Sequence, residues 1–255
     1  MAKTALIGYT GFVGGNIASQ HQFDDLYNTS NINDINGQSY DLVVSAATYA
    51  EMWKINQDPQ GDLDQINGLI AHLKKIKTKK FVLISTVGVY KNPAGADEDT
   101  PIDLNGLAPY GANRYHLEEF VHNSFDSLII RLPGLFGRGL KKNVVYDLAH
   151  DNMVDKIHLD GAYQYYNLKN IWRDINTALK NNLKLVNFTA EPVASGELAK
   201  YCFDKDISHQ RPEGITPPFW DVHSKHAELF GGRNPYLYSK QQELDGIREY
   251  LRSQT

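Results

Sequence analysis

The sequence predicts an α/β protein with a doubly wound parallel sheet, followed by a small irregular C-terminal lobe. Three observations carry this prediction. Short apolar runs alternate with helical patterns, glycines recur at three-residue spacing directly after the first run, and the alternation loosens after about residue 133. Apolar runs separated by helical patterns are typical of strands that are buried on both faces of a parallel sheet.

Five apolar runs are predicted strands, at residues 4–7, 42–45, 81–85, 128–132 and 183–188. A crossover helix is expected between the second and third strands, because apolar residues recur there at helical spacing. They are Leu63, Ile66, Leu69, Ile70, Leu73 and Ile76. The lysines at 74, 75, 77, 79 and 80 are expected to close this helix, where positive charge complements the helix dipole.

The second half of the chain is broken by glycines and prolines into shorter pieces. We therefore assign residues 1–134 and 167–190 to the sheet domain, and residues 135–166 and 191–255 to a small lobe that would bind the substrate. The final amphipathic segment, residues 239–252, is expected to form a helix.

The first strand leads into a glycine turn that predicts dinucleotide binding. Gly8 can adopt dihedral angles closed to other residues, Gly11 lets the backbone approach a pyrophosphate, and Gly14 lets a helix pack close to the strand. The helix that follows presents free N–H groups and a positive dipole end to the diphosphate. The residues assigned to the cofactor on this turn are Gly8, Thr10, Gly11, Phe12, Val13 and Gly14.

Composition excludes several classes of function. The net charge is −4 and the basic residues are not gathered into arms, so neither a nucleic acid nor a membrane surface is an expected partner. A single cysteine, Cys202, excludes an intramolecular disulfide and a cysteine metal cluster. With no apolar signal-peptide core and no window of transmembrane length, the sequence predicts a cytoplasmic protein. The histidines at 209, 223 and 226 are interpreted as surface residues, and no metal site is expected.

The chain resembles the extended short-chain dehydrogenase/reductase superfamily, and within it the NAD-dependent epimerase/dehydratase branch. The resemblance covers residues 3 to about 140. It rests on the glycine turn, Ser85-Thr86 with Val89-Tyr90, Glu98-Asp99-Thr100-Pro101, Tyr110-Gly111 and the segment from Arg131 to Gly137. It implies a Rossmann-type fold, a nucleotide sugar or related carbohydrate as substrate, and a homodimer formed through the helices that follow residues 62 and 110.

The resemblance implies catalytic roles for four residues. Tyr110 matches the tyrosine that acts as general acid/base toward a substrate hydroxyl, and Arg114 stands where the family has a lysine that lowers the tyrosine pKa. Arginine keeps the positive charge but differs in shape and cannot release a proton. Thr86 aligns with the residue that hydrogen-bonds the reacting hydroxyl, and Ser85 is expected to assist it.

The resemblance also bears on the reaction and the cofactor. The family's 4,6-dehydratases carry Asp-Glu after the position of Thr86, whereas this chain has Val87-Gly88, which argues against dehydration. NAD-specific members usually end the second strand of the sheet with an acid, but residues 27–31 carry neither an acid nor a base, so both NAD and NADP stay open, and only the family's habits favour NAD. The further residues assigned to the cofactor are Asn28, Ser30, Ala46, Ala47, Thr48 and Pro133.

The expected substrate contacts are less defined. Gly134 replaces an asparagine that contacts the diphosphate in many nucleotide-sugar enzymes. The polar residues at 138 and 141–143 would either bind a diphosphate or form a solvated loop, and those at 163–167 would either contact substrate or pack along a strand.

The sequence therefore predicts an NAD(P)-dependent epimerase or oxidoreductase acting on a nucleotide sugar. Two alternatives stay open. One is a carbonyl reductase that consumes NADPH, and the other is a protein that senses a dinucleotide without turnover, which the replacement of lysine by Arg114 would allow.

Overall fold

The structure, a computed structural model, describes residues 3–254 and divides into two compact units. The first unit contains the described residues up to 91 together with residues 100–131 and 171–186. The second contains residues 92–99, 132–170 and those from 187 onward. The loop at 92–99, which the sequence analysis placed in the sheet domain, thus groups with the second unit.

A six-stranded parallel sheet forms the centre of the first unit, in the order β2-β1-β3-β4-β5-β9. Its strands are β1 (Thr4–Ile7), β2 (Asp25–Tyr27), β3 (Ser39–Ser45), β4 (Lys77–Thr86), β5 (Ser127–Leu132) and β9 (Leu185–Asn187). The chain order reverses between β1 and β3, which pair in parallel. In sheets of this kind, ligands bind outside the carboxyl ends of the strands at such a reversal.

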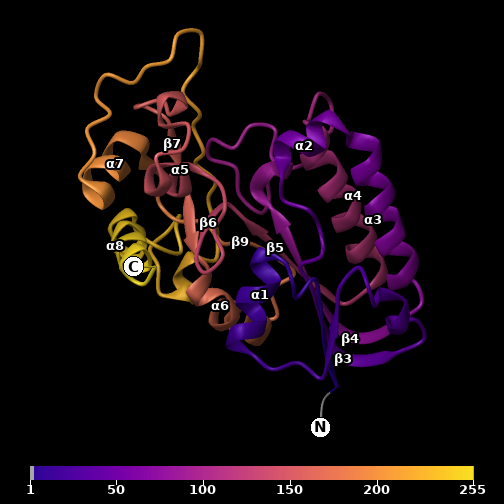
Figure 1. Cartoon of the computed structure of the whole chain (residues 1–255). Coiled ribbons are helices and arrows are strands. Elements are labelled where there is room, and N and C mark those ends of the chain that lie inside the picture. Colours follow the sequence, from indigo (N-terminus) through magenta and orange to yellow (C-terminus); the bar gives the residue numbers. More distant parts are fainter. Residues whose placement is uncertain (1–2, 255) are drawn as a thin grey trace. The chain divides into compact units, whose positions relative to one another are not determined.

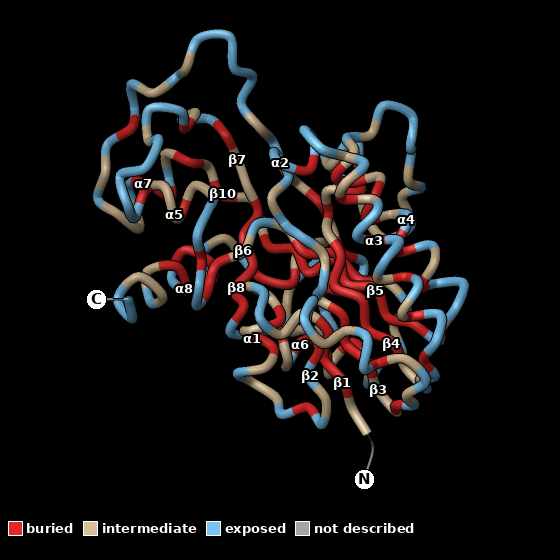
Figure 2. The backbone as a smooth tube through the Cα atoms, turned by 45° about the vertical axis from the view of Figure 1, so that its right-hand side comes forward, coloured by how far each residue is buried: buried red, intermediate tan, exposed pale blue. Residues whose placement is uncertain are grey.

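Helices cover both faces of this sheet, with α3 and α4 on one face and α1 and α6 on the other (Figure 1). The helices of this unit are α1 (Phe12–Gln20), α2 (Met52–Gln57), α3 (Pro59–Leu73), α4 (Pro109–Ser124) and α6 (Ile171–Lys180), with short 3₁₀ turns at Ile32–Ile35 and Val87–Val89. Buried residues concentrate on the central strands (Figure 2). The core against α3 and α4 includes Val43, Ile66, Phe81 and Leu117, and the predicted Rossmann-type fold is confirmed.

The lysine-rich segment after α3 differs from the prediction. The helix ends at Leu73, and Lys77, Lys79 and Lys80 belong to β4, so the expectation that they close the helix is wrong. Exposed and half-buried residues alternate at the start of this strand, as the period of a strand requires. Lys79 forms an ion pair at 2.6 Å with Asp41 of the neighbouring strand β3.

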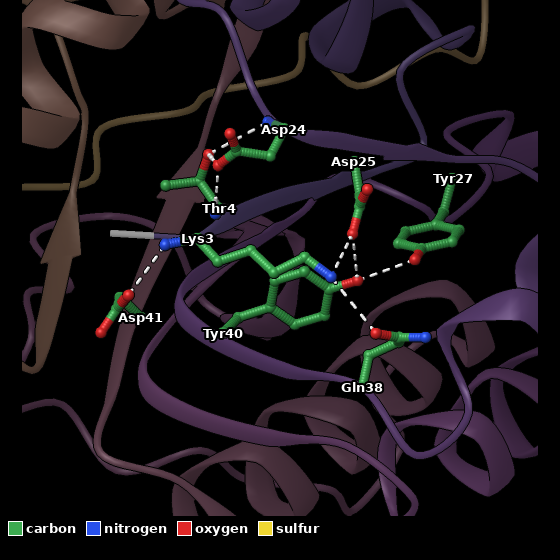
Figure 3. Close-up of polar contacts among 8 residues, drawn as sticks. All are labelled: Lys3, Thr4, Asp24, Asp25, Tyr27, Gln38, Tyr40 and Asp41. Atoms are coloured by element: carbon green, nitrogen blue, oxygen red, sulfur yellow. Dashed lines mark hydrogen bonds and ion pairs between the residues drawn. The ribbon is translucent and has the colours of Figure 1, made fainter. Parts of the chain in front are cut away.

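A polar network joins the first three strands (Figure 3). The Lys3 Nζ lies 2.9 Å from the Asp25 carboxylate and 3.2 Å from the Gln38 side-chain oxygen. The Tyr40 hydroxyl donates to Asp25 at 2.8 Å and is 2.7 Å from the hydroxyl of Tyr27. Burial raises the pKa of Asp25, but the hydrogen bonds from Lys3 and Tyr40 outweigh it and hold this pKa below its usual range.

The second unit is built from short elements. Its strands are β6 (Gly134–Phe136), β7 (Ala162–Tyr163), β8 (Tyr165–Asn167) and β10 (Val193–Ala194), in two sheets of two strands each. Its helices are α5 (Val144–His150), α7 (Ser195–Phe203) and α8 (Lys240–Arg252), with 3₁₀ turns at Val154–Lys156, Leu168–Asn170 and Ala227–Phe230. Ser239 and Gln242 form a capping box at the start of α8, which confirms the predicted C-terminal helix. Within residues 3–254, no helix is long and apolar enough to cross a membrane.

We predict that Asp25→Asn lowers the free energy of unfolding at pH 7 by about 1 kcal/mol, because the charge-assisted bonds to Asp25 are weakened. The pKa of Asp25 is lower in the folded protein, so its contribution is fully present above the unfolded pKa of about 3.9 and is lost as the pH falls through the folded value. Urea denaturation at pH 7 and pH 3 should therefore show that the difference in the free energy of unfolding between the wild type and Asp25→Asn is smaller at pH 3. The exposed Asp34→Asn is the control, and an equal loss at both pH values would contradict this role.

Candidate active site

The glycine turn after β1 has the geometry that close backbone contact requires. Gly8 has a φ of +89°, its N–H donates to the Tyr27 carbonyl at 2.7 Å, and a Cβ there would lie 2.5 Å from the Ala46 carbonyl oxygen. A Cβ on Gly14 would overlap the carbonyl oxygen of Gly8. Side chains at these two positions would therefore force α1 away from the ends of β1 and β3.

The start of α1 fits an anionic ligand. Gly11 is exposed, and a Cβ there would meet only the Gly8 carbonyl oxygen, at 3.3 Å. As N-cap, Gly11 offers no side chain, so the first N–H groups of α1, from Phe12 and Val13 onward, are not capped by it. Thr10 is exposed beside them. Uncapped N–H groups at a helix start suit a pyrophosphate, so these residues fit a dinucleotide cofactor.

The side chains after β2 bind one another. The Asn28 side-chain oxygen accepts hydrogen bonds from the Ser30 N–H at 2.9 Å and the Ser30 hydroxyl at 2.6 Å. The Asn28 amide donates to the Tyr9 hydroxyl at 3.3 Å. After β3, Ala46 and Thr48 are half-buried and Ala47 is exposed. Both segments follow strands on either side of the chain reversal, where a cofactor is expected.

Tyr110 and Thr86 come together at the end of β4. Tyr110 is the second residue of α4 and is 9% exposed. A Cβ on Gly88 would lie 3.0 Å from Cε1 of Tyr110 and 3.3 Å from Oγ1 of Thr86, so the ring and the hydroxyl border the same point. A Cβ on Gly111 would overlap the Gly88 carbonyl oxygen. Glycines at 88 and 111 therefore permit the approach that brings Tyr110 beside Thr86.

Ser85 belongs to a buried charged network. Its hydroxyl donates to Glu118 of α4, and this carboxylate also accepts from Arg131 of β5 at 2.6 Å. Arg131 donates in addition to the Tyr90 hydroxyl at 2.7 Å. Burial opposes the charge of Arg131, but the bonds and charge of Glu118 outweigh it and raise the pKa of the guanidinium. The network ties β4, α4 and β5 together directly behind Thr86.

Arg114 lies one turn after Tyr110 and points toward α3. Its guanidinium is 2% exposed, with Cζ 4.5 Å from the centre of the Tyr110 ring. One terminal nitrogen is 2.5 Å from the Asp62 carboxylate, and the other donates to the Tyr49 carbonyl. Nε is buried without a hydrogen-bond partner among the described residues. Sequence reasoning did not identify Asp62.

The second unit holds the remaining predicted positions. Pro133 and Gly134 follow β5, and a Cβ on Gly134 would lie 2.7 Å from the Gln164 carbonyl oxygen, so the pairing of β6 with β8 favours glycine there. Tyr165 and Tyr166 are completely or almost completely buried, which favours the packing interpretation for both. Asn143 caps α5 by accepting from two backbone N–H groups.

Glu98, one of the residues on which the family resemblance rests, has a structural role that the sequence did not indicate. Glu98 accepts hydrogen bonds from the Asn187 N–H at 2.8 Å, the Ser224 hydroxyl at 2.7 Å and the Lys225 N–H at 2.9 Å. It thereby fixes the 92–99 loop within the second unit. The partners are about 90 and 125 residues away, beyond the reach of any local pattern.

The described residues contain no group of three or more metal-ligating side chains of the His, Cys, Asp and Glu types. His223 lies 3.4 Å from Asp221. Burial raises the pKa of the Cys202 thiol to about 12, which disfavours the reactive thiolate.

The chain belongs to the NAD-dependent epimerase/dehydratase family, whose model matches residues 19–176. The match begins after the glycine turn and includes Thr86, Tyr110 and Arg114. Membership identifies the protein as an enzyme of an NAD(P)-dependent, sugar-modifying family. No curated protein matches the chain significantly.

Solved structures of this class share the fold. A dTDP-4-dehydrorhamnose reductase from Bacillus anthracis, in complex with NADP, aligns over 100% of both chains with 15% identity and a TM-score of 0.74. An NAD-dependent NDP-hexosamine 5,6-dehydratase involved in tunicamycin biosynthesis has 17% identity and a TM-score of 0.73, over 99% of this chain and 97% of the other. The UDP-glucose 4-epimerase of Thermotoga maritima, solved with UDP-glucose, has 15% identity and a TM-score of 0.69, over 98% of this chain and 97% of the other.

We predict that Glu118→Gln lowers the free energy of unfolding by about 3 kcal/mol, because it leaves the buried Arg131 without a compensating charge. The exposed Glu119→Gln on the same helix is the matched control and should change stability by less than about 0.5 kcal/mol. Chemical denaturation measures both values. Equal stability of the two variants would contradict a structural role for the pair.

Proposed function

We propose that the protein is an NAD(P)-dependent epimerase or oxidoreductase that acts on a nucleotide sugar or related carbohydrate, with Tyr110 as its general acid/base. The observation that carries the proposal is the placement of Tyr110, whose ring borders Thr86 at Gly88 and lies against the guanidinium of Arg114. The glycine turn in the same unit fits a dinucleotide, and family membership supports the class of substrate.

Each residue has a distinct task in this proposal. The Tyr110 phenolic oxygen, once it has lost its own proton, takes the proton of the substrate hydroxyl and returns it in the reverse direction, and a bound nicotinamide would supply hydride exchange at the same carbon. The Thr86 oxygen accepts the Gly88 N–H at 3.0 Å, which leaves its own proton to donate to a substrate oxygen. Arg114 keeps a positive charge against the Tyr110 ring.

A 4,6-dehydratase is disfavoured. That reaction needs an acid and a base after the position of Thr86, but Val87 is a buried core residue that is only 4% exposed. At Gly88 even a Cβ would come within 3.0 Å of the Tyr110 ring. A carboxylate at either position would have to displace the core or the tyrosine, so epimerisation or carbonyl reduction is the reaction we propose.

The pairing of Arg114 with Asp62 specifically favours one alternative, a protein that binds a dinucleotide without turnover. A compensated guanidinium supports a phenolate less than a free ammonium would. The other alternative is a carbonyl reductase. It would differ from an epimerase and from a sensor because it consumes NADPH steadily in the presence of a keto-sugar.

We further propose a homodimer formed through α3 and α4 and a cytoplasmic location. Both follow from the family's habits and from the sequence.

We predict that Tyr110→Phe binds NAD(H) within about twofold of the wild type and lowers turnover at least about 100-fold, because general acid/base catalysis is worth roughly this factor. Calorimetry measures binding. Turnover is followed by chromatography of nucleotide sugars for epimerisation, and by loss of cofactor absorbance with keto-sugars for reduction. A Tyr110→Phe variant with wild-type rates would exclude it as the acid/base, and a wild type that binds cofactor without either turnover would favour the sensor.

We predict that NAD binds more tightly than NADP. The segment 28–31 after β2 carries no lysine or arginine, so a 2′-phosphate would meet no positive side chain there. Calorimetric titration of the wild type with each cofactor should give a dissociation constant for NADP at least about tenfold higher, equal to about 1.4 kcal/mol. Tighter binding of NADP would reverse this assignment.

A further inference from the structure

The acidic partner of Arg114 is held rigidly. Asp62 lies in the first turn of α3, with a side chain that is 5% exposed. The oxygen that contacts Arg114 also accepts from the Asn113 amide at 2.8 Å, and Asn113 donates to the Pro59 carbonyl at 3.0 Å. Asp58 caps the same helix through the Gly61 N–H at 3.0 Å. The carboxylate is therefore fixed by its own helix and by the residue that precedes Arg114.

Arg114 in turn has little freedom. Its two terminal nitrogens are bound, to the Asp62 carboxylate and the Tyr49 carbonyl, while the guanidinium faces the Tyr110 ring. Since an arginine fork binds a carboxylate in a defined geometry, the position of Asp62 determines where the guanidinium can lie. Without Asp62, one carbonyl would remain as the hydrogen-bond anchor of a buried cation.

Other charged groups around Asp62 and along α4 are engaged elsewhere. On α2, the exposed Lys54 is paired with Glu51 at 2.7 Å. Further along α4, Glu118 is bound by Arg131. Among the ion pairs of the described residues, Asp62 is therefore the carboxylate that is paired with Arg114.

We propose that Asp62 is a positioning residue for the reaction: it holds the Arg114 guanidinium against Tyr110 and offsets part of its charge. This inference rests on the proposed function, because it concerns the residue assigned as acid/base. Asp62 of α3 would thus join Tyr110 and Arg114 of α4 as a third residue of the catalytic arrangement. This arrangement also implies that a lysine at 114 would work better without Asp62 than with it, because an ammonium would be drawn to the carboxylate.

The first test measures the proton affinity of Tyr110 in the protein without cofactor. Tyrosine labelled with ¹³C at Cζ is titrated by NMR, and Tyr110→Phe assigns the signal. Asp62→Asn should weaken proton binding at the Tyr110 hydroxyl about tenfold, because the guanidinium is no longer compensated. Asp64→Asn, an equal change at an exposed position of the same helix, should leave it unchanged. An unchanged titration in Asp62→Asn would overturn the proposal.

The second test measures turnover. Asp62→Asn should lower kcat about tenfold or more while the dissociation constant of NAD(H) stays within about threefold, because a guanidinium that remains beside the ring but is no longer fixed by the carboxylate holds the tyrosine less well in its reactive orientation. Adding Arg114→Lys to this variant should restore most of kcat, since a flexible ammonium needs no fork partner. A double variant no more active than Asp62→Asn would mean that Asp62 is only structural, and would overturn the proposal.

The outcomes separate this inference from the proposed function. The titration needs no substrate, so a wild type without turnover would contradict the proposed function but not a Tyr110 titration that depends on Asp62. If Asp62→Asn fails to fold, judged by circular dichroism, the same titration is made on Asp62→Asn/Arg114→Lys. Weaker proton binding than in the wild type is again expected, and equality would overturn the proposal.

Discussion

Close approach of backbone to backbone is the constraint on which the site depends. The first turn of α1 meets the end of β1 where Gly14 lies against the Gly8 carbonyl, and the first turn of α4 meets the end of β4 where Gly111 lies against the Gly88 carbonyl. In both places a single Cβ would overlap an oxygen atom. One contact shapes the turn that fits a diphosphate, and the other brings Tyr110 to Thr86.

Because the sheet is parallel, both contacts lie at carboxyl ends of strands, on the same edge. The network of Ser85, Glu118 and Arg131 then holds α4 against β4 and β5 from behind. The hydroxyl of Ser85 is used in this network, so its contribution to the reaction would be to fix the strand that carries Thr86. Under the proposed function, packing and catalysis would thus draw on neighbouring residues of one strand.

Local patterns predicted much of the fold and part of the site. The glycine turn, the buried strands and the stripe on α3 were visible because their period or spacing is short. The same stripe held a signal that went unused: Asp62 precedes Ile66 by four residues and Ile70 by eight, so it lies on the buried face of the helix. A carboxylate there needs a partner. That the partner is Arg114, 52 residues away, depends on how α3 packs on α4, which no local pattern contains.

Under the proposed function, an arginine at the position where the resemblance implies a lysine would change where the electrostatic support for Tyr110 comes from. A guanidinium paired with a carboxylate acts at short range as a dipole with its positive end toward the ring, and its field falls faster with distance than that of a free charge. Under the proposed function, the uncompensated positive charge that supports Tyr110 as acid/base would then come from a bound oxidised nicotinamide. A coupling free energy between two sites is reciprocal, so the cofactor's charge and the tyrosine would influence each other. The Arg114 and Asp62 pair would thus make the acid/base responsive to the oxidation state of the cofactor beside it.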